Sequence, residues 1–280
     1  MIDIAIIGGS GLYKIDGMKD VKEIAVNTPF GAPSDKIITG TLSGVKIGFL
    51  ARHNRAHLFT PTEVPYRANV YALKKLGARI VLSFSACGSL RENMPPKSFC
   101  FPDQIVDKTT LRPNTFFGNG VVDHFPFGHP ISISVQKAFA QEAKKLKLKH
   151  KLTGTVVAME GPLFSTKAES LWHRKMGWDL IGMTSCPESK LIREAGMAFG
   201  FCAMITDYDS WRDNTEDVSH DMVKEVMKYN EVAAKKLLAA ALPKIAALKN
   251  AGERKASIYK DMLAKNQNKT QVKKLKVIFD

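Results

Sequence analysis

An α/β fold is predicted from three features of the sequence: short apolar runs, stretches of helical period between them, and enough length for one large core. The apolar runs are rich in β-branched and aromatic residues and show little polar alternation, which is typical of strands buried on both faces. We expect these strands at residues 2–7, 45–51, 79–86, 153–159 and 199–206. Because strands and helical patterns alternate, the sheet should carry helices packed against it.

Three helices are predicted between and after these strands. Residues 66–77 end with basic side chains and Gly77, which is typical of a helix C-terminus. A second helix is indicated by apolar residues at steps of four, four and three, namely Val135, Phe139, Ala143 and Leu146. The last helix should begin with Ser219 as N-cap and Asp221 in its first turn. Its apolar face is expected to comprise Met222, Val226, Tyr229, Ala233 and Leu237.

Composition indicates a folded chain that could bury a sizeable core. Of its 280 residues, 45% are hydrophobic and 24% are charged, which favours one large domain without long disordered segments. We expect a folded domain over residues 1–250 and a basic, partly helical C-terminal tail over 251–280. The longest apolar runs are too short to span a membrane, and Met1 leads directly into a predicted strand. The sequence therefore predicts a cytoplasmic protein with no membrane partner.

The four cysteines favour neither a disulfide framework nor a metal site. Cys87, Cys100, Cys186 and Cys202 are widely spaced, with no C-x-x-C pair and no clustered histidines. We therefore expect buried thiols and no bound metal.

The net charge of +14 raises the possibility of a nucleic-acid partner. Residues 224–280 hold 14 Lys and Arg against 5 Asp and Glu, so most of the excess lies in the last helix and tail. No helix-turn-helix signature, zinc finger or base-stacking aromatic motif accompanies this charge. The sequence favours a solvated basic surface and predicts no nucleic-acid partner, while a weak contact with an acidic partner stays open.

The first predicted strand ends in a glycine loop, within the run IAIIGGSGLY at residues 4–13. A nicotinamide dinucleotide is one interpretation, but that motif needs G-x-G-x-x-G at the start of a helix. Here Gly8, Gly9 and Gly11 stand close together around Ser10, and residue 13 is Tyr. The loop therefore indicates either a tight turn or a site for a smaller anion.

Polar residues follow the other predicted strands at the edge where α/β sheets bind ligands. Arg52 and His53 follow the second strand, and Ser85 lies at the end of the third. Met183, Thr184 and Ser185 follow the short apolar stretch at 180–182. An arginine with hydroxyls and backbone amides makes a suitable set of donors for phosphate. Each residue alone has an ordinary structural explanation, such as a surface ion pair for Arg52 or a turn for Ser10.

Asp207 and Asp209 follow the last predicted strand, in the stretch AMITDYDSW. If the extended conformation continues for three residues, both side chains point the same way. Mutual repulsion and burial should then raise the pKa of one carboxyl, which could hold a proton near neutral pH. The alternative is a solvated turn with a helix N-cap.

Taken together, these motifs resemble the trimeric purine nucleoside phosphorylases, and among them the S-methyl-5'-thioadenosine phosphorylases, from about residue 2 to 245. The resemblance rests on ordered motifs that include IIGGSGL, TPFGAPSD, LARHNRAH, SACGSLRE, TTLRPNTFF, EGPLFSTKAES, GMTSCPE and TDYDSW. It implies a mixed central sheet flanked by helices in a single phosphorylase-like domain. It also implies that the first glycine loop helps to hold inorganic phosphate.

The resemblance implies roles for individual positions of this chain. Ser10, Arg52, His53, Ser85, Ala86 and Thr184 fall where the family binds phosphate. Phe164 and Met183 match positions that pack against the base and ribose, and Asp207 and Asp209 match the pair that contacts the purine. Ser165 and His220 are carried over as candidates for substrate specificity. Tyr66 and Asn69 belong to a matching segment without an assigned role.

The implied reaction is phosphorolysis, in which phosphate displaces a purine from C1' of a nucleoside and leaves a ribose 1-phosphate. Asp207 would donate to N7 of the leaving purine, and the phosphate would stabilise the ribosyl cation. No cofactor or metal is implied, because inorganic phosphate is the co-substrate. Two aspartates favour a 6-aminopurine, since the 6-oxopurine enzymes of this family typically have Asn at the first position.

Departures from the family pattern leave the 5' group of the nucleoside open. His220 stands where methylthioadenosine enzymes typically have an apolar residue, and Lys224 where they have Leu. Leu163 replaces a usual Arg, and Lys97 and Ser98 replace a usual Gly-Asp turn. The main hypothesis is an S-methyl-5'-thioadenosine phosphorylase, and the alternative is an adenosine or broader purine nucleoside phosphorylase. A non-enzymatic hypothesis is a basic nucleic-acid binder that retains an inert phosphorylase fold.

The family assembles as trimers, in some cases paired into hexamers. We therefore expect a homo-oligomer in which the segment around His124 can reach the pocket of an adjacent subunit.

Overall fold

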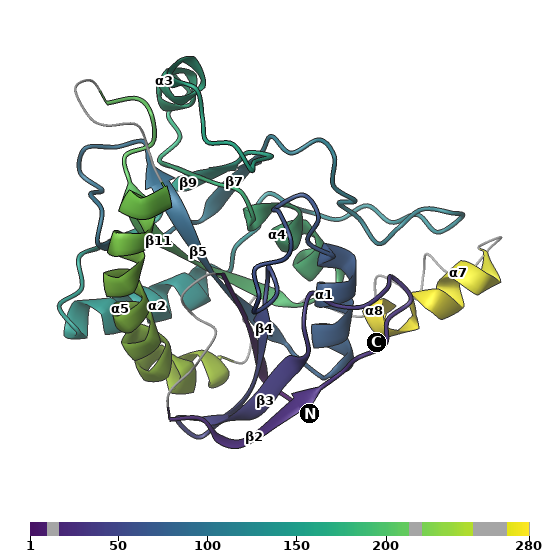
Figure 1. Ribbon diagram of the computed structural model, residues 1–280. Helices are drawn as coiled ribbons and strands as arrows, with labels where there is room; N and C mark the ends of the chain where they lie inside the picture. The colour runs from purple at the N-terminus through teal and green to yellow at the C-terminus, as the bar shows by residue number, and fades with distance from the viewer. Residues whose placement is uncertain (10–16, 213–219, 249–267, 280) are drawn as a thin grey trace.

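A computed structural model describes residues 1–9, 17–212, 220–248 and 268–279, with the backbone alone described for 220–223. Within these residues one mixed sheet forms the centre of the molecule (Figure 1). Its strands are β1 (Ile4–Gly8), β2 (Lys19–Ile24), β3 (Ile37–Leu42), β4 (Val45–Ala51), β5 (Ile80–Ser89), β6 (Ser98–Phe101), β7 (Gln104–Asp107), β8 (His150–Leu152), β9 (Thr155–Ala158), β10 (Leu180–Gly182) and β11 (Ala198–Asp207). The mixed sheet flanked by helices that the resemblance implied is confirmed.

The sheet runs in the order β2-β3-β4-β1-β5-β10-β9-β7, and β11, β6 and β8 branch from β5. The central strands are parallel: β1 pairs with β4 and β5, and β5 pairs with β11. Antiparallel pairs include β2 with β3, β3 with β4, and β10 with β5. The carboxyl ends of β4, β1, β5 and β11 therefore lie at one edge of the sheet.

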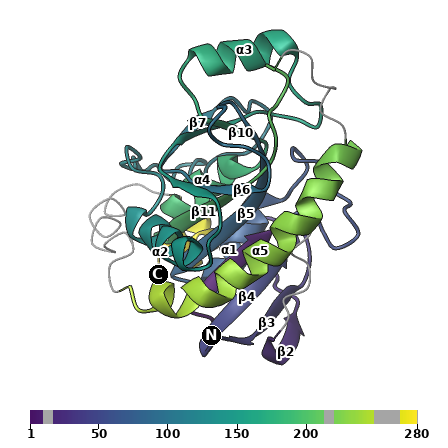
Figure 2. The ribbon, with the colours of Figure 1, turned by 90° about the vertical axis from the view of Figure 1, so that its left-hand side faces the viewer.

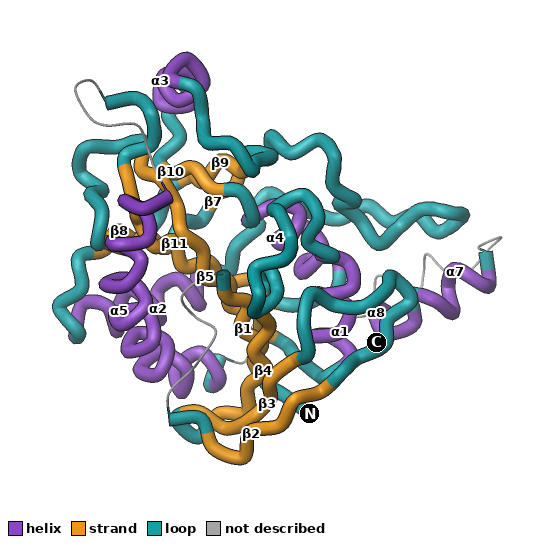
Figure 3. The backbone as a smooth tube through the Cα atoms, viewed as in Figure 1, coloured by secondary structure: helices purple, strands orange, loops and turns teal. Residues whose placement is uncertain are grey.

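The described helices are α1 (Tyr66–Lys75), α2 (Ile133–Lys145), α3 (Lys167–Lys175), α4 (Ser185–Glu194), α5 (His220–Ala246), α7 (Lys269–Lys274) and α8 (Lys276–Phe279). Figure 2 shows α2 and α5 together on one face of the sheet. The helices α1, α4 and α8 cover the other face. The long segment 108–132 forms no helix or strand and extends past α4 (Figure 3).

Each sheet face has its own hydrophobic core, as the alternation of side chains along β1 shows. Ile4 and Ile6 pack with α2 and α5, whereas Ala5 and Ile7 pack with α1 and α4. Because each strand contributes to both cores, its sequence is continuously apolar rather than alternating.

All five expected strands are present: β4 has the predicted limits, and the other four end within three residues of theirs. The strands that sequence reasoning missed are short or partly exposed, such as β2, in which five of six residues are exposed. The first helix ends at a glycine, as predicted. Gly77 lies one residue beyond the C-cap Leu76 and has φ of 100°. There the amides of Gly77 and Ala78 donate to the carbonyls of Lys74 and Leu73, which is a Schellman motif.

The predicted apolar face of α5 is partly wrong. Tyr229 is 49% exposed, and the buried stripe runs instead through Asn230, Ala234 and Leu238, together with Ala233 and Leu237. Asn230 is tolerated there because its side-chain amide donates to the carbonyl of Ile205 (3.0 Å). The expected N-cap Ser219 lies outside the described residues.

The C-terminal residues 268–279 pack on the body of the protein. Leu275 and Ile278 are buried in the core shared with α1. Phe279 stacks on Phe117 at a ring separation of 6.5 Å, and the Lys274 ammonium lies 4.9 Å from the ring centre of Phe30. The tail therefore adds apolar contacts as well as charge.

Ile278→Ala is expected to lower the free energy of unfolding by about 2–5 kcal/mol, because it leaves a cavity in a packed core. Urea denaturation followed by circular dichroism measures the change. Lys276→Ala on the exposed side of the same helix is the control and should stay within about 0.5 kcal/mol of the parent. Equal effects of the two substitutions would contradict the docked position of the tail.

Candidate active site

The candidate site lies where the carboxyl ends of four parallel strands meet the start of α4. Arg52 and His53 follow β4, Ser85 and Ala86 lie near the end of β5, and Asp207 ends β11. Ala86 is exposed although its neighbours in this central strand are buried. An exposed residue in the middle of the sheet means that the surface is open at this point. The fold therefore brings most of the predicted residues to one place.

Arg52 is almost completely buried and is held by a carboxylate that sequence reasoning missed. Its Nε donates to Oε1 of Glu188 (2.8 Å) and its Nη2 to Oε2 (3.1 Å). Ser83 bridges the pair, since Arg52 Nη2 donates to its Oγ (2.8 Å) and that hydroxyl donates to Glu188 (2.6 Å). The third nitrogen, Nη1, donates to the carbonyl of Phe84 and lies beside Gly9 in the glycine loop. The guanidinium is thus oriented with its Nη1 side toward Gly9, at the end of β1.

His53 lies beside Arg52 and is 9% exposed. Its Nδ1 lies 2.9 Å from the carbonyl oxygen of Phe59, and its ring stacks on His57. Burial and the neighbouring Arg52 charge lower the pKa of His53 to about 4. The imidazole is therefore neutral at pH 7.

Two hydroxyls complete this half of the site. The Oγ of Ser85 and the Oγ1 of Thr184 lie 3.0 Å apart, and both residues are buried. Thr184 precedes α4 and makes no side-chain capping bond, so its hydroxyl bonds Ser85 alone among the described residues. Cys186 has extended φ and ψ of −119° and 140°, so the regular part of α4 begins after Cys186 rather than at Thr184. The Arg52 guanidinium and the two hydroxyls together form a set of hydrogen-bond donors suited to phosphate.

The two aspartates do not sit side by side on an extended strand, so that part of the prediction is wrong. The strand ends at Asp207, and Asp209 has φ of 52°, in the left-handed region. The backbone amide of Asp209 donates to Asp207 Oδ1 (2.8 Å), and Thr206 Oγ1 donates to Oδ2 (2.7 Å). Burial raises the pKa of Asp207, with only a small contribution from the Asp209 charge. The expected direction is therefore found, but desolvation rather than repulsion is its main cause.

Asp209 is anchored by α3, through a residue that sequence reasoning missed. The buried Ser170 of α3 donates its hydroxyl to Asp209 Oδ2. Burial raises the pKa of Asp209, and the bonds from Ser170 and Ser165 act in the opposite direction. Gly88 leaves room for both aspartates: a Cβ at this position would lie 2.8 Å from Asp207 Oδ1. This packing explains the glycine in SACGSLRE.

Of the residues expected at the base and ribose, Ser165 lies beside Asp209. Ser165 is buried, and Ser210 Oγ donates to its carbonyl (2.8 Å) next to Asp209. Met183 lies against Gly161, and Phe164 is 45% exposed. Ser10 lies outside the described residues. His220 begins α5, but its side chain lies outside the described part of the chain.

Arg112 joins the two halves of the site, although no role was predicted for it. Its side chain is buried and forms an ion pair with Glu160 (2.9 Å). Its Nη1 donates to the carbonyls of Met183 and Cys186, on either side of Thr184, and to the Tyr66 hydroxyl. An arginine within the motif TTLRPNTFF could have indicated such a role, but its partners are remote in sequence. Tyr66 and Asn69 support the structure around the site. The Tyr66 hydroxyl accepts from Arg112, and Asn69 Oδ1 accepts from the amide of Ser34 (2.7 Å).

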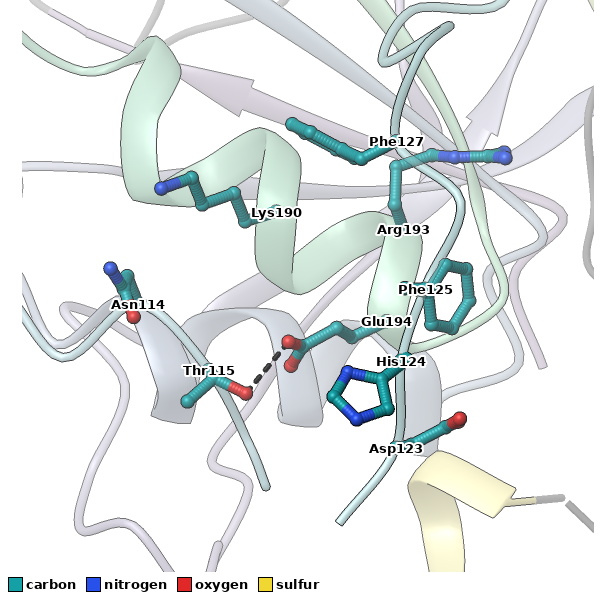
Figure 4. Close-up of a pocket in the computed structure, with 9 residues that line it drawn as sticks. All are labelled: Asn114, Thr115, Asp123, His124, Phe125, Phe127, Lys190, Arg193 and Glu194. Carbon is teal, nitrogen blue, oxygen red and sulfur yellow. Dashed lines mark hydrogen bonds between the residues drawn. The ribbon is translucent and has the colours of Figure 1, made fainter. Parts of the chain in front are cut away.

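A separate hollow of about 280 Å³ lies at the other end of α4 (Figure 4). It is lined by Lys190, Arg193 and Glu194 of the helix and by residues 114–127, including His124. Thr115 Oγ1 donates to Glu194 (2.7 Å), and burial raises the pKa of this glutamate to about 7. None of the predicted phosphate or nucleoside residues with a described position lines this hollow, so it is distinct from the candidate site.

Comparison with known proteins identifies the family. The model of the Phosphorylase superfamily matches residues 3–243. The S-methyl-5'-thioadenosine phosphorylase of Geobacter sulfurreducens is 47% identical over 243 residues, which cover 86% of this chain and 85% of the relative. The chain belongs to the phosphorylase superfamily, among its S-methyl-5'-thioadenosine phosphorylases. The family resemblance inferred from the motifs is confirmed.

Solved structures agree with this membership. A methylthioadenosine phosphorylase from an Antarctic soil metagenomic library has a TM-score of 0.89 and 38% identity, covering 99% of this chain and 98% of that protein. A variant of the adenosine/methylthioadenosine phosphorylase from Schistosoma mansoni, in complex with methylthioadenosine, has a TM-score of 0.85 and 34% identity, covering 96% of this chain and all of that protein. The phosphorylase-like fold is therefore confirmed over the length of the chain.

Asp207→Asn is expected to increase the free energy of unfolding at pH 7, because it removes a buried carboxylate. Since burial raises the pKa of Asp207 in the folded state, its charged form costs stability as pH rises above the unfolded-state value of about 3.9. Urea denaturation at pH 4.5 and pH 7 measures this difference, and the gain should be larger at pH 7.

Asp35→Asn is the matched control, because the pKa of Asp35 is lowered whereas that of Asp207 is raised. Burial acts to raise the pKa of Asp35, but hydrogen bonds from Arg55 hold it below its usual range. This substitution should lower stability at pH 7. A loss of stability in Asp207→Asn would contradict the buried position assigned to that carboxyl.

Proposed function

We propose that this protein cleaves S-methyl-5'-thioadenosine with inorganic phosphate, giving adenine and 5-methylthioribose 1-phosphate. The observation that carries the proposal is the adjacency of a donor set for phosphate and a buried carboxyl whose pKa is raised. The relatives named above are methylthioadenosine phosphorylases, which supports the same substrate. Phosphorolysis fits this geometry because the nucleophile and the leaving base need separate, adjacent sites.

In the proposed reaction, phosphate binds between the glycine loop, Arg52 and the hydroxyls of Ser85 and Thr184. One of its oxygens forms a bond to C1' as the C1'–N9 bond breaks. The electron pair of that bond moves into the purine, and Asp207 transfers its proton to N7. Because the carboxyl is buried, its neutral form is stabilised and can serve as the acid, typically worth about 10²–10⁴-fold in rate. Asp209 would contact the purine from its anchored position on Ser170.

We assign the nucleoside to the surface formed by Met183, Phe164 and Ser165, with the 5' group near the start of α5. The alternative substrate is adenosine or another 5'-hydroxyl purine nucleoside. His220 at the first position of α5 favours this alternative, because a histidine can hydrogen-bond a hydroxyl but not a thiomethyl group. The Schistosoma mansoni relative carries both substrates in its name.

Release of adenine, measured by chromatography with and without added phosphate, tests the proposal. Release should require phosphate, and kcat/KM should be higher for S-methyl-5'-thioadenosine than for adenosine. Asp207→Asn should lower kcat/KM for both by about 10²–10⁴-fold and relatively favour 6-oxopurine nucleosides. A control, Asp35→Asn, should keep parental kinetics.

Each outcome separates the hypotheses. Adenine release without phosphate contradicts phosphorolysis, and a preference for adenosine supports the alternative substrate. A lack of any cleavage, together with salt-dependent binding of DNA or RNA, supports the non-enzymatic hypothesis.

The proposal includes no cofactor, since phosphate is the second substrate. It also places the enzyme in the cytoplasm. The four cysteines are free and buried, which agrees with a reducing compartment. No helix in the described ranges is long and apolar enough to cross a membrane.

We further propose that the protein is a homo-oligomer, as its family membership implies. Apolar side chains are exposed on and beside α3, which stands away from the sheet in Figure 2. These are Leu163, Phe164, Leu171, Trp172 and Met176. An exposed patch of this kind is typical of an interaction site. Because Phe164 and Ser165 adjoin the nucleoside surface, an interface here would border the candidate site.

Light scattering coupled to size-exclusion chromatography should give a mass that is a multiple of the chain mass of 30.9 kDa. Leu171→Glu should reduce this mass, because a charge would be buried in the interface. Val21→Glu, on the exposed edge strand β2, is the control and should leave it unchanged. A monomeric parent protein would rule out the assembly.

A further inference from the structure

The side chain of Arg112 is fully buried, and each of its three nitrogens donates to a protein acceptor. Its Nε donates to Glu160 Oε1 (2.9 Å), and its Nη2 donates to the carbonyl of the same residue. Its Nη1 donates to the carbonyls of Met183 and Cys186 and to the Tyr66 hydroxyl. A guanidinium bonded in this way orients the chain around it rather than binding a ligand itself.

On the anion side, Arg112 holds a segment that the helix does not hold. The two carbonyls bonded by its Nη1, those of Met183 and Cys186, flank Thr184 in the chain. Thr184 makes no side-chain capping bond, and Cys186 has extended rather than helical φ and ψ. The Thr184 hydroxyl lies 3.0 Å from that of Ser85. The bonds from Arg112 therefore help to fix a hydroxyl of the donor set for phosphate.

On the nucleoside side, the same guanidinium holds a second segment. Its Nη2 donates to the carbonyls of Met159 (3.4 Å) and Glu160. These residues begin the stretch that leads to Phe164 and Ser165, which are expected at the base and ribose. The Ser165 hydroxyl also bonds Met159, with 3.7 Å between Oγ and Sδ. One side chain thus connects the segments assigned to the two substrates.

The carboxylate of Glu160 fixes the guanidinium in turn. Its Oε1 accepts from Thr62 Oγ1 (2.5 Å), and its Oε2 accepts from the amides of Thr110 (2.7 Å) and Leu111 (3.2 Å). Burial acts to raise the pKa of Glu160, but these bonds and the one from Arg112 hold it at about 2. The carboxylate is therefore charged at pH 7, and the ion pair with Arg112 is complete.

We propose that Arg112 is a positioning residue that holds the anion side and the nucleoside side of the site in one arrangement, so that both substrates bind more weakly when the guanidinium is lost. The planar fork is needed because the carbonyls belong to separate segments, and a lysine has one nitrogen where an arginine has three. The inference rests on the proposed function for the identity of the two substrates, and it adds a residue that links their sites.

Arg112→Lys keeps the positive charge and removes the fork. Titration calorimetry with phosphate alone, and with S-methyl-5'-thioadenosine alone, measures both dissociation constants without turnover. Both should rise about 10-fold, and kcat/KM should fall by about 10²-fold, because the displaced groups no longer fit their ligands.

Gln136→Met is the matched control for a structural effect. Gln136 is also fully buried, and its amide donates to the carbonyls of Pro102 and Phe201 from α2, on the other face of the sheet. This substitution should lower the melting temperature, because it leaves buried carbonyls unpaired. It should keep both dissociation constants at the parental values.

A double-mutant cycle tests whether Arg112 acts on the anion through Thr184. Thr184→Val removes the hydroxyl and should itself weaken phosphate binding. Adding Arg112→Lys to Thr184→Val should then raise the phosphate dissociation constant by less than about threefold, while the effect on the nucleoside remains. Glu160→Gln, which keeps the guanidinium but removes its paired charge, should weaken both ligands and replaces Arg112→Lys if that variant does not fold.

The outcomes are distinct from those for the proposed function. Unchanged dissociation constants in Arg112→Lys, or in Glu160→Gln as its replacement, overturn the inference. A loss of phosphate affinity alone that is equally large with and without the Thr184 hydroxyl indicates direct contact with the anion and also overturns it. Phosphorolysis with unchanged affinities in these variants retains the function and rejects the positioning role. Joint loss of both affinities in a protein that binds both ligands without turnover rejects the function and retains the positioning role.

Discussion

The parallel pairing of β4, β1, β5 and β11 is the constraint on which the rest of the molecule depends. Parallel strands end at the same edge, so residues that are far apart in the sequence become neighbours there. Arg52, Ser85 and Asp207 meet for this reason, and β10 delivers Thr184 and α4 to the same edge. Two independent cores hold these strands from both faces, which gives the site a rigid base.

Burial then decides the chemistry of each charged group at that edge. Arg52 is buried with a carboxylate partner, and the pair leaves the guanidinium fixed and nearly neutral as a unit. Asp207 has no cation in hydrogen-bond contact among the residues that the structure describes, and burial raises its pKa and favours its protonated form. His53 is kept neutral by burial and by Arg52. One buried edge thus contains a set of donors suited to an anion and a carboxyl that is held in its protonated form, which the proposed reaction uses as its acid.

Residues outside the site hold these groups in place. Arg112 bonds the backbone on both sides of Thr184, Ser170 anchors Asp209, and Gly88 leaves the space that the aspartates occupy. Such support matters because a donor displaced by 1 Å loses much of its effect on a transition state. The exposed apolar patch on α3 is connected to the same site through Ser170, so assembly and catalysis would share one element.

The sequence by itself determined the α/β class, the five main strands, the family and most residues at the strand ends, because strand periodicity and the ordered motifs are local. It did not reveal Glu188, Ser170 or the role of Arg112, since each acts on a partner more than 35 residues away. It also predicted an extended pair of aspartates where the chain turns at Asp209, because strand ends depend on tertiary packing. The protonation states of His53 and Asp207 were decided only by the tertiary structure, because burial is the main cause of both pKa shifts.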